Sequence, residues 1–298
     1  MIWRVVNNRP MRPLLALVAV TAVWGVTFVQ VKDAVEVYPI LPFLAVRFGI
    51  ASAVLAPAAP RVRGLGRRGA AGAALAGALL GAGYVLQTLG LERTSVSSAG
   101  FVTGMYVVLT PLIALVLFRL QVGSAAWLGV GLATAGLAML AGIHGGSATG
   151  DLLVLAAAAV YSLQIVLMER YAPRYDPFAF TLVEMLVAFA GLAVAAIPTA
   201  AVPRGWTVWG ALIVTGIFAS ALGFLVQTWA QRRASATRTA LVFTLEPVWA
   251  ALFGYTLAGD RLGALGWGGC AVIMAGIVLA EPAAAATLVR LIRRPSPA

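Results

Sequence analysis

Charged residues, cysteine, histidine and lysine are all scarce in this 298-residue chain, and each scarcity excludes a class of function. Charged side chains make up 10% of the residues, whereas a soluble domain carries about 25%. With Cys270 and His144 each alone of their kind, a disulfide within the chain, a His/Cys metal site and a histidine-based triad have no partners. No phosphate-binding loop ending in lysine occurs, because Lys32 is the only lysine. We therefore expect no catalytic residues, metal or cofactor.

Hydrophobic side chains dominate instead, at 61% of the residues with a mean hydropathy of +0.96. Several apolar runs exceed the roughly 18 residues that mark a bilayer span, which predicts an all-α polytopic membrane protein. Ten predicted spans run approximately over 13–31, 39–59, 69–90, 96–118, 125–143, 150–169, 177–200, 206–229, 236–258 and 263–281. The net charge of +11 comes from arginines near the span ends, which set orientation in a membrane, so we expect no nucleic-acid partner.

The positions of arginine and lysine predict how the chain is threaded. With the N-terminus inside, sixteen of the 21 Arg and Lys residues fall on the inner side and four on the outer side, and Arg47 lies within a span. This asymmetry predicts a multi-pass protein of the cell (inner) membrane with both termini cytoplasmic. The predicted domains are a first five-helix repeat over 1–143, a second, inverted repeat over 144–281 and a basic cytoplasmic tail over 282–298.

An internal repeat supports this division. The stretch from Gly83 to Pro111 is echoed from Gly223 to Pro247, with an aromatic residue and then Gln-Thr at the same spacing and an offset of 140. Five spans in each half is an odd number, so the second copy begins on the opposite face of the membrane. Inverted repeats of this kind place a substrate site at their interface near the midplane. Pro111 lies four residues later than this spacing requires, which predicts an extra helical turn in the first copy.

Three ionisable side chains fall inside predicted spans, where each is costly and needs a reason. Arg47 either bonds helix-end carbonyls or anchors an anionic or zwitterionic substrate. Glu184 matches Arg47 at an offset of 137 and either carries a coupling proton, belongs to a structural pair or faces a loop. For Glu246 a structural role is the favoured interpretation, because Pro247 frees a backbone carbonyl one turn earlier and a nearby acid could help to restructure that region. The alternative is that Glu246 is a charge anchor.

Uncharged polar and aromatic side chains gather in spans 1, 3, 4, 6 and 8. Interhelical hydrogen bonding or packing explains any one of them, but together they predict a central cavity. The predicted substrate-binding residues are Trp24, Thr27, Tyr84, Gln87, Phe101, Tyr106, Tyr161, Gln164, Phe224 and Gln227. Small residues at four-residue spacing, Gly77 with Gly81 and Gly131 with Ala135, predict close helix packing.

Trp24-Gly25, Pro42 ahead of Arg47, the run from Gln87 to Pro111 and Leu245-Glu246-Pro247 form a familiar combination. It resembles the EamA-type transporters of the drug/metabolite transporter superfamily over nearly the whole chain. The resemblance implies ten spans in two repeats and transport of small organic solutes, with export common.

One departure from the family pattern concerns an acidic residue that members often carry soon after spans 4 and 9. Asp260 follows span 9, whereas Arg119-Leu120-Gln121 follows span 4 without an acid.

These observations predict a secondary transporter, in the direction of export, for a small polar organic solute such as an amino acid or metabolite. Alternating access through the cavity is the expected mechanism, either coupled to protons through Glu184 or as an uncoupled facilitator. From other classes, a membrane-embedded transferase or lipid-handling enzyme is a weaker alternative, and a receptor or scaffold predicts no central polar cavity. The expected partners are the solute, the lipid bilayer and, if transport is coupled, protons; the oligomeric state stays open.

Overall fold

The computed structural model describes residues 11–94, 96–141, 147–253, 255–256 and 263–280. The predicted basic tail (282–298), His144 and the acidic position Asp260 lie outside the described residues. Throughout the described part, regular structure is helical. The prediction of an all-α protein is therefore confirmed.

The first half of the chain contains long helices and one broken one. Its elements are α1 (Met11–Val37), α2 (Ile40–Leu55), the 3₁₀ segment η1 (Ala56–Leu65), α3 (Gly66–Arg93), α4 (Val96–Gly104), α5 (Tyr106–Phe118) and α6 (Ser124–Ala141). The interruption between α4 and α5 falls at Met105.

The second half follows the same order. Its elements are α7 (Ala148–Tyr171), the 3₁₀ turn η2 (Ala172–Arg174), α8 (Pro177–Ala196), the 3₁₀ turn η3 (Ile197–Thr199), α9 (Gly205–Ile213), the π-helical segment η4 (Val214–Leu222), α10 (Gly223–Gln231), α11 (Ala236–Phe243), α12 (Leu245–Phe253) and α13 (Ala264–Ala280). The interruption between α11 and α12 falls at Thr244, the counterpart of the break at Met105.

Local sequence explains where several helices begin. Asp176 precedes α8, its carboxylate accepts a hydrogen bond from Ala179 N at 3.0 Å, and Pro177 occupies the first helical position. Ser147 and Ser235 cap α7 and α11 in the same way. Each cap satisfies a backbone N–H that a helix N-terminus otherwise leaves without a partner.

Six helical segments are long and apolar enough to cross a membrane. They are Arg12–Val37, Ile40–Arg93, Ser98–Phe118, Ala148–Arg174, Pro177–Thr199 and Gly205–Gln231, and two shorter apolar helices cover Ser124–Leu140 and Ala264–Ala280. A lipid-facing chain must satisfy its backbone groups internally, which these helices do. The prediction of a polytopic membrane protein is confirmed.

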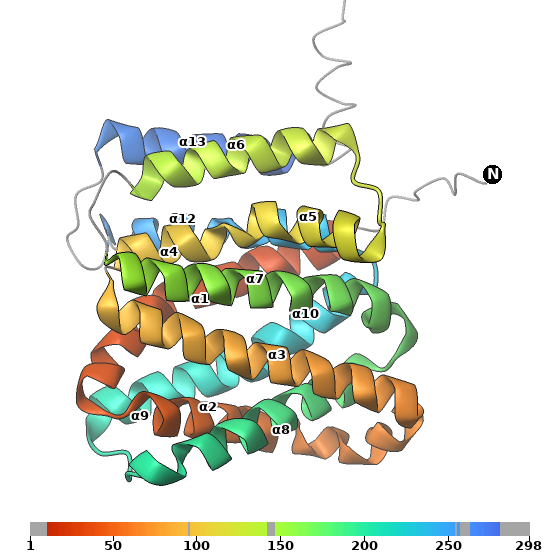
Figure 1. The fold of residues 1–298 in the computed structure, drawn as a ribbon, viewed down its shortest axis with the longest axis vertical. Helices are drawn as coiled ribbons and strands as arrows, with labels where there is room; N and C mark the ends of the chain where they lie inside the picture. The colour runs from red at the N-terminus through yellow and green to blue at the C-terminus, as the bar shows by residue number, and fades with distance from the viewer. Residues whose placement is uncertain (1–10, 95, 142–146, 254, 257–262, 281–298) are drawn as a thin grey trace, which may run out of the picture.

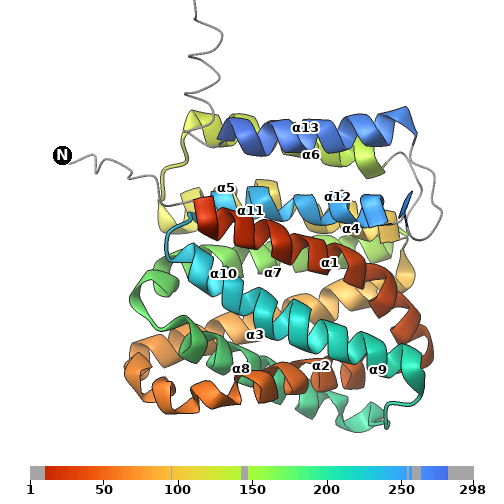
Figure 2. The same ribbon diagram turned by 180° about the vertical axis from the view of Figure 1, so that it is seen from behind.

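The helices stack in layers that mix the two halves of the chain (Figures 1 and 2). α6 and α13 lie side by side as a separate layer at one end of the molecule, and α2 and α8 lie together at the other. Between them, α3 packs against α7 and α8, while α1 packs against α10 and α12. Residues from the two halves therefore face each other at the centre of the bundle.

Glycines allow the closest of these contacts. A Cβ atom added at Gly136 of α6 would lie 2.6 Å from Gly269 O of α13, and one added at Gly129 would lie 2.7 Å from Gly276 O. The two backbones touch, as expected where small residues line a membrane helix interface.

The predicted pair in this helix, Gly131 with Ala135, was wrong. Both are exposed, and no heavy atom lies within 4 Å of a Cβ added at Gly131. The contact repeats every seven residues along α6, not every four.

We expect Gly136→Leu to destabilise the protein by about 1–3 kcal/mol, because the added side chain would overlap the α13 backbone. Gly131→Leu is the matched control on the same helix, since its side chain would enter open space. The measurement is the midpoint of thermal unfolding in detergent. Equal midpoints for the two variants would contradict the backbone contact between α6 and α13.

Candidate functional site

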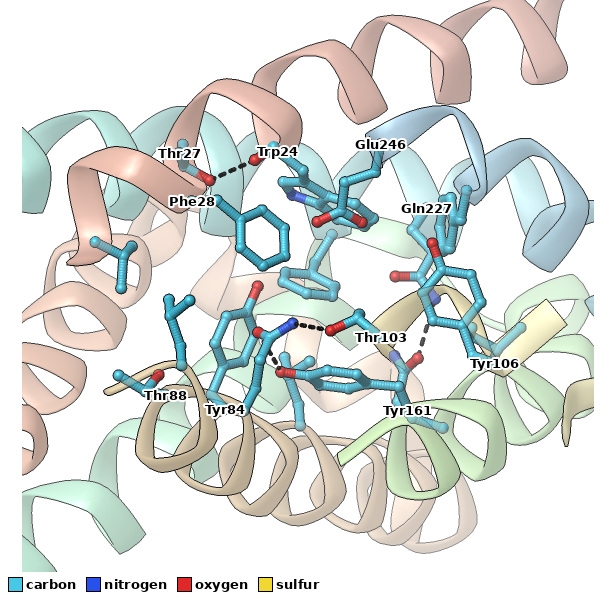
Figure 3. A pocket seen from close by; sticks show the side chains of 18 of the residues that line it. Trp24, Thr27, Phe28, Tyr84, Thr88, Thr103, Tyr106, Tyr161, Gln227 and Glu246 are labelled. Atoms are coloured by element: carbon cyan, nitrogen blue, oxygen red, sulfur yellow. Dashed lines mark hydrogen bonds between the residues drawn. The ribbon is translucent and has the colours of Figure 1, made fainter. Parts of the chain in front are cut away.

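A cavity of about 70 Å³ lies at the centre of the bundle, where the two halves meet (Figure 3). Its lining includes most of the predicted site residues, namely Trp24, Thr27, Arg47, Tyr84, Gln87, Tyr106, Tyr161, Gln164, Phe224, Gln227 and Glu246. Residues that are separated by more than two hundred positions in the sequence therefore surround one space.

Two predicted residues, Phe101 and Glu184, do not line the cavity. Phe101 is partly buried against the hydrophobic core. Successive helical residues are rotated by about 100°, so Phe101 points away from the side of α4 on which Thr103 reaches the cavity. Glu184 is fully buried and lies behind Gln164, whose Nε2 donates a hydrogen bond to it and whose side chain lines the cavity.

The structure adds lining residues that the sequence analysis did not select for the site: Phe28, Val31, Leu80, Thr88, Leu91, Thr103, Ile165 and Phe243. Most are apolar, and polarity was the signal used. The repeat offset holds a second signal, because 140 positions relate Thr103 to Phe243 and 137 relate Phe28 to Ile165. Applying the offset to the polar residue Thr103, for example, finds its apolar counterpart Phe243.

Arg47 is held at the cavity by both halves of the protein. Its Nε donates to Ser220 Oγ at 2.8 Å, and its Nη2 donates to Tyr84 Oη at 3.0 Å. The guanidinium carbon also lies 4.3 Å from the Tyr84 ring centroid, a favourable cation–π contact. These contacts satisfy part of a buried charge and fix the direction in which the guanidinium faces.

Beside Arg47, a second hydrogen-bonded group joins three helices. Gln87 Nε2 donates to Thr103 Oγ1 at 3.1 Å, and Tyr161 Oη donates to Gln87 Oε1 at 3.1 Å. The rings of Tyr84 and Tyr161 meet edge to face with centroids 5.6 Å apart. The polar atoms of Gln87 are therefore oriented by neighbours on α4 and α7.

A chain of amides connects the cavity to Glu184. Gln164 Nε2 donates to Glu184 Oε1 at 2.8 Å, and Gln227 Nε2 donates to Gln164 Oε1 and to Gln231 Oε1, each at 3.0 Å. Gln231 Nε2 in turn donates to Ile165 O at 2.9 Å. Glu184 Oε2 and Gln227 Oε1 are buried and accept no hydrogen bond from the described residues. This chain is thus incompletely satisfied at both of those oxygens.

Glu246 reaches the cavity from the break between α11 and α12. It is 8% exposed, and Figure 3 shows its carboxyl group directed into the cavity near Trp24. Among the described residues the one salt bridge joins Arg61 to Asp176, so Glu246 has no ion-pair partner. Glu246 therefore lines the cavity, and its two predicted roles, structural support beside Pro247 and a charge anchor, both stay predictions.

Aromatic rings form the rest of the wall. The Trp24 ring centroid lies 5.5 Å from that of Phe224 and 4.8 Å from that of Phe243, and Trp24 Nε1 donates to Ala219 O at 2.9 Å. Thr27 Oγ1 donates to Trp24 O at 2.8 Å, so its hydroxyl is satisfied within α1. The ring of Trp24 is fixed in place rather than free to rotate.

The two halves use matching contacts with exchanged partners. A Cβ at Gly83 would overlap the Tyr161 ring, and one at Gly223 would approach Trp24 Nε1 to 3.0 Å. Likewise Gly77 meets the backbone of Glu184, and a Cβ at Gly216 would lie 3.1 Å from Arg47 O. Glycine therefore makes room for the partner repeat at equivalent places in each half.

This correspondence continues through the broken helices. Ser162 Oγ donates to Tyr106 O at 3.4 Å, and a Cβ at Gly25, the counterpart of Ser162, would lie 2.7 Å from Glu246 O. Tyr106 and Glu246 are thus equivalent at the unchanged offset of 140. The prediction of an extra helical turn before Pro111 is wrong. The two halves stay aligned at an offset of 140, and only the proline occupies a different position, one helical turn later in the first half than in the second.

Comparison with known proteins gives the chain its family. The model of the EamA-like transporter family matches residues 11–142 and again 148–280. An uncharacterized transporter of Archaeoglobus fulgidus is 29% identical over 257 residues, covering 86% of this chain and 81% of that protein. The uncharacterized transporter YyaM of Bacillus subtilis is 26% identical over 244 residues, covering 75% and 79%.

A solved crystal structure shows the same fold, with a TM-score of 0.75 at 21% identity, covering 92% of this chain and 99% of the other. Both halves of the chain match the family model separately, which agrees with the internal repeat and with the exchanged glycine contacts. The predicted resemblance is confirmed: this chain belongs to the EamA-like transporter family.

Proposed function

We propose that the protein is a secondary transporter that exports a small polar organic solute, such as an amino acid or metabolite, by alternating access. The observation that carries the proposal is the central cavity, whose polar and aromatic side chains come from both halves of the chain. Rocking of one repeat against the other would expose such a site to each side in turn. Export is proposed because it is the common direction in the families that this chain resembles.

We further infer ten membrane crossings in two inverted repeats, with the domain limits 1–143 and 144–281. In this arrangement α2 and α3 cross separately on either side of η1, and each broken helix crosses once. The packing of the helices supports this arrangement. The repeat makes α10 the counterpart of the second part of α3, and α7 the counterpart of α1; α3 packs against α7, and α10 packs against α1. In the same way α5 packs against α7, and its counterpart α12 packs against α1.

Contacts between connecting segments agree with this threading. Tyr38 Oη donates to Ala201 O at 2.8 Å, and both residues belong to connections assigned to the outer side. Arg61 and Asp176 form a salt bridge at 3.9 Å, and both belong to connections assigned to the inner side. The inner surface of a cell membrane is where arginine-rich connections reside, which favours cytoplasmic termini.

The threading predicts opposite labelling of two exposed positions. In a Cys270→Ala background, we expect Val202→Cys to react with a membrane-impermeant maleimide added to intact cells. Arg63→Cys should react only after the cells are permeabilised, because its connection lies inside. Labelling of both positions from the same side would contradict the predicted threading.

Proton coupling through Glu184 is the energy source that we propose. Glu184 is fully buried, pairs with no cation among the described residues, and is one hydrogen bond from Gln164 at the cavity. A carboxyl group so placed can bind and release a proton as the cavity opens to either side. Solute binding at Gln164 or Gln227 would disturb the same hydrogen-bond chain.

We expect Glu184→Gln to abolish the response of solute flux to a pH gradient in proteoliposomes, while solute exchange at equal pH persists. The amide keeps the size of the side chain but cannot carry the proton. Glu36→Gln, at the exposed end of α1, is the control and should keep the wild-type response. If solute flux through the wild-type protein is the same with and without a pH gradient, the protein is an uncoupled facilitator.

A further inference from the structure

We propose that the solute is a zwitterion, with its anionic group bound at Arg47 and its cationic group bound at Glu246. This inference rests on the proposed transport function and names the substrate class of the same cavity. The two charges come from different repeats, because Arg47 is on α2 and Glu246 is on α12. A single solute with both charges would therefore join the two halves.

Arg47 and Glu246 line the same cavity without pairing with each other. Both side chains are buried and both reach the cavity. No Arg47 nitrogen lies within 4.0 Å of a Glu246 oxygen, since the described residues form a salt bridge only between Arg61 and Asp176. Two unpaired opposite charges in a buried site are unfavourable until each finds a partner. A zwitterion supplies both partners at once.

The anionic end is assigned to Arg47 because its guanidinium is held in place before a solute arrives. Ser220 and Tyr84 take two of its donors, at 2.8 and 3.0 Å. Its planar fork of N–H donors matches the geometry of a carboxylate. The contacts orient the group, and the permanent positive charge excludes a purely cationic solute.

The cationic end is assigned to the wall at Glu246 because other oxygen atoms that can accept hydrogen bonds lie at the same wall. Gln227 Oε1 is buried and has no hydrogen-bond partner among the described residues. Gln227 and Tyr106 line the cavity with Glu246, and Figure 3 shows the side chains of Gln227 and Tyr106 across the cavity from Tyr84. An ammonium group carries three N–H donors, which this group of oxygens can accept.

Other charge classes fit the cavity less well. An anion would leave Glu246 unpaired and be repelled by it, and a cation would meet the same difficulty at Arg47. A neutral solute could hydrogen-bond to both groups but would supply a counter-charge to neither. A cavity of about 70 Å³ also favours a compact head group in this conformation. The anion remains the competing class if Glu246 is protonated.

The test compares four forms of one amino acid that differ only in charge. Alanine, leucine and phenylalanine serve as probes, each as the free zwitterion, the cationic amide, the N-acetyl anion and the neutral N-acetyl amide. Binding is measured by thermal shift and calorimetry on the full chain in detergent, and transport by counterflow in proteoliposomes. For at least one probe we expect the zwitterion to bind about tenfold or more tightly than its three capped forms.

Charge-removing variants test which wall binds which end. Glu246→Gln should weaken the zwitterion by about tenfold or more and favour the N-acetyl anion over the amide. Arg47→Gln should weaken the zwitterion similarly and favour the amide over the anion. Glu36→Gln, at the exposed end of α1, should change neither preference. If Arg47→Gln prevents folding, Arg47→Lys keeps the charge and should retain the preference for the zwitterion.

Separate outcomes distinguish this inference from the transport function. Counterflow of an anionic or neutral form that equals or exceeds that of the zwitterion would overturn the zwitterion assignment and leave transport intact. If Glu246→Gln leaves the preference among the zwitterion, the N-acetyl anion and the amide unchanged, Glu246 does not bind the cationic end of the solute. A folded protein that neither binds nor moves any form of the three probes overturns the assignment for amino acids and also counts against the proposed function.

Discussion

Burying a permanent charge within an apolar helical bundle is the constraint on which the centre of this protein depends. The Arg47 guanidinium cannot lose its charge, so hydrogen-bond acceptors and an aromatic face must meet it. Ser220 from the second half and Tyr84 from the first supply them. One buried arginine thereby ties the two repeats together and fixes the position of a cavity wall. The same contacts that satisfy the charge also hold it at the cavity.

Close backbone packing makes this arrangement possible. Glycine at Gly77, Gly83, Gly216 and Gly223 leaves room for side chains or backbone of the other repeat, and Gly129 and Gly136 let α6 touch α13 in the same manner. Van der Waals packing and interhelical hydrogen bonds are the main forces between membrane helices, because lipid is as apolar as the helix surface. The mixed layers of the fold follow from these contacts, and so does the meeting of two sets of polar residues.

The duplication explains both the symmetry and the asymmetry of the site. Equivalent positions carry Trp24 and Tyr161, and Gln87 and Gln227, so each half contributes an aromatic ring and an amide. At other equivalent positions the residues differ, with Arg47 against Glu184 and Tyr106 against Glu246. A shared scaffold needs the first kind of pair. If the cavity binds an asymmetric solute, as proposed, only the second kind of pair can distinguish its two ends, because charge and size there differ between the halves.

Composition, hydropathy and the repeat determined the helical membrane class and most of the residues around the cavity, because span length and buried polarity leave local marks in a sequence. The family was predicted from the resemblance carried by motifs such as Trp24-Gly25 and Leu245-Glu246-Pro247. Tertiary structure decided the rest. Phe101 faces away because of its angle on α4, Glu184 lies behind Gln164, and Glu246 enters the cavity at the break between α11 and α12. Gly129 and Gly136, not Gly131, meet α13. Each of these depends on how a helix is rotated against a distant neighbour, and no local pattern specifies that rotation.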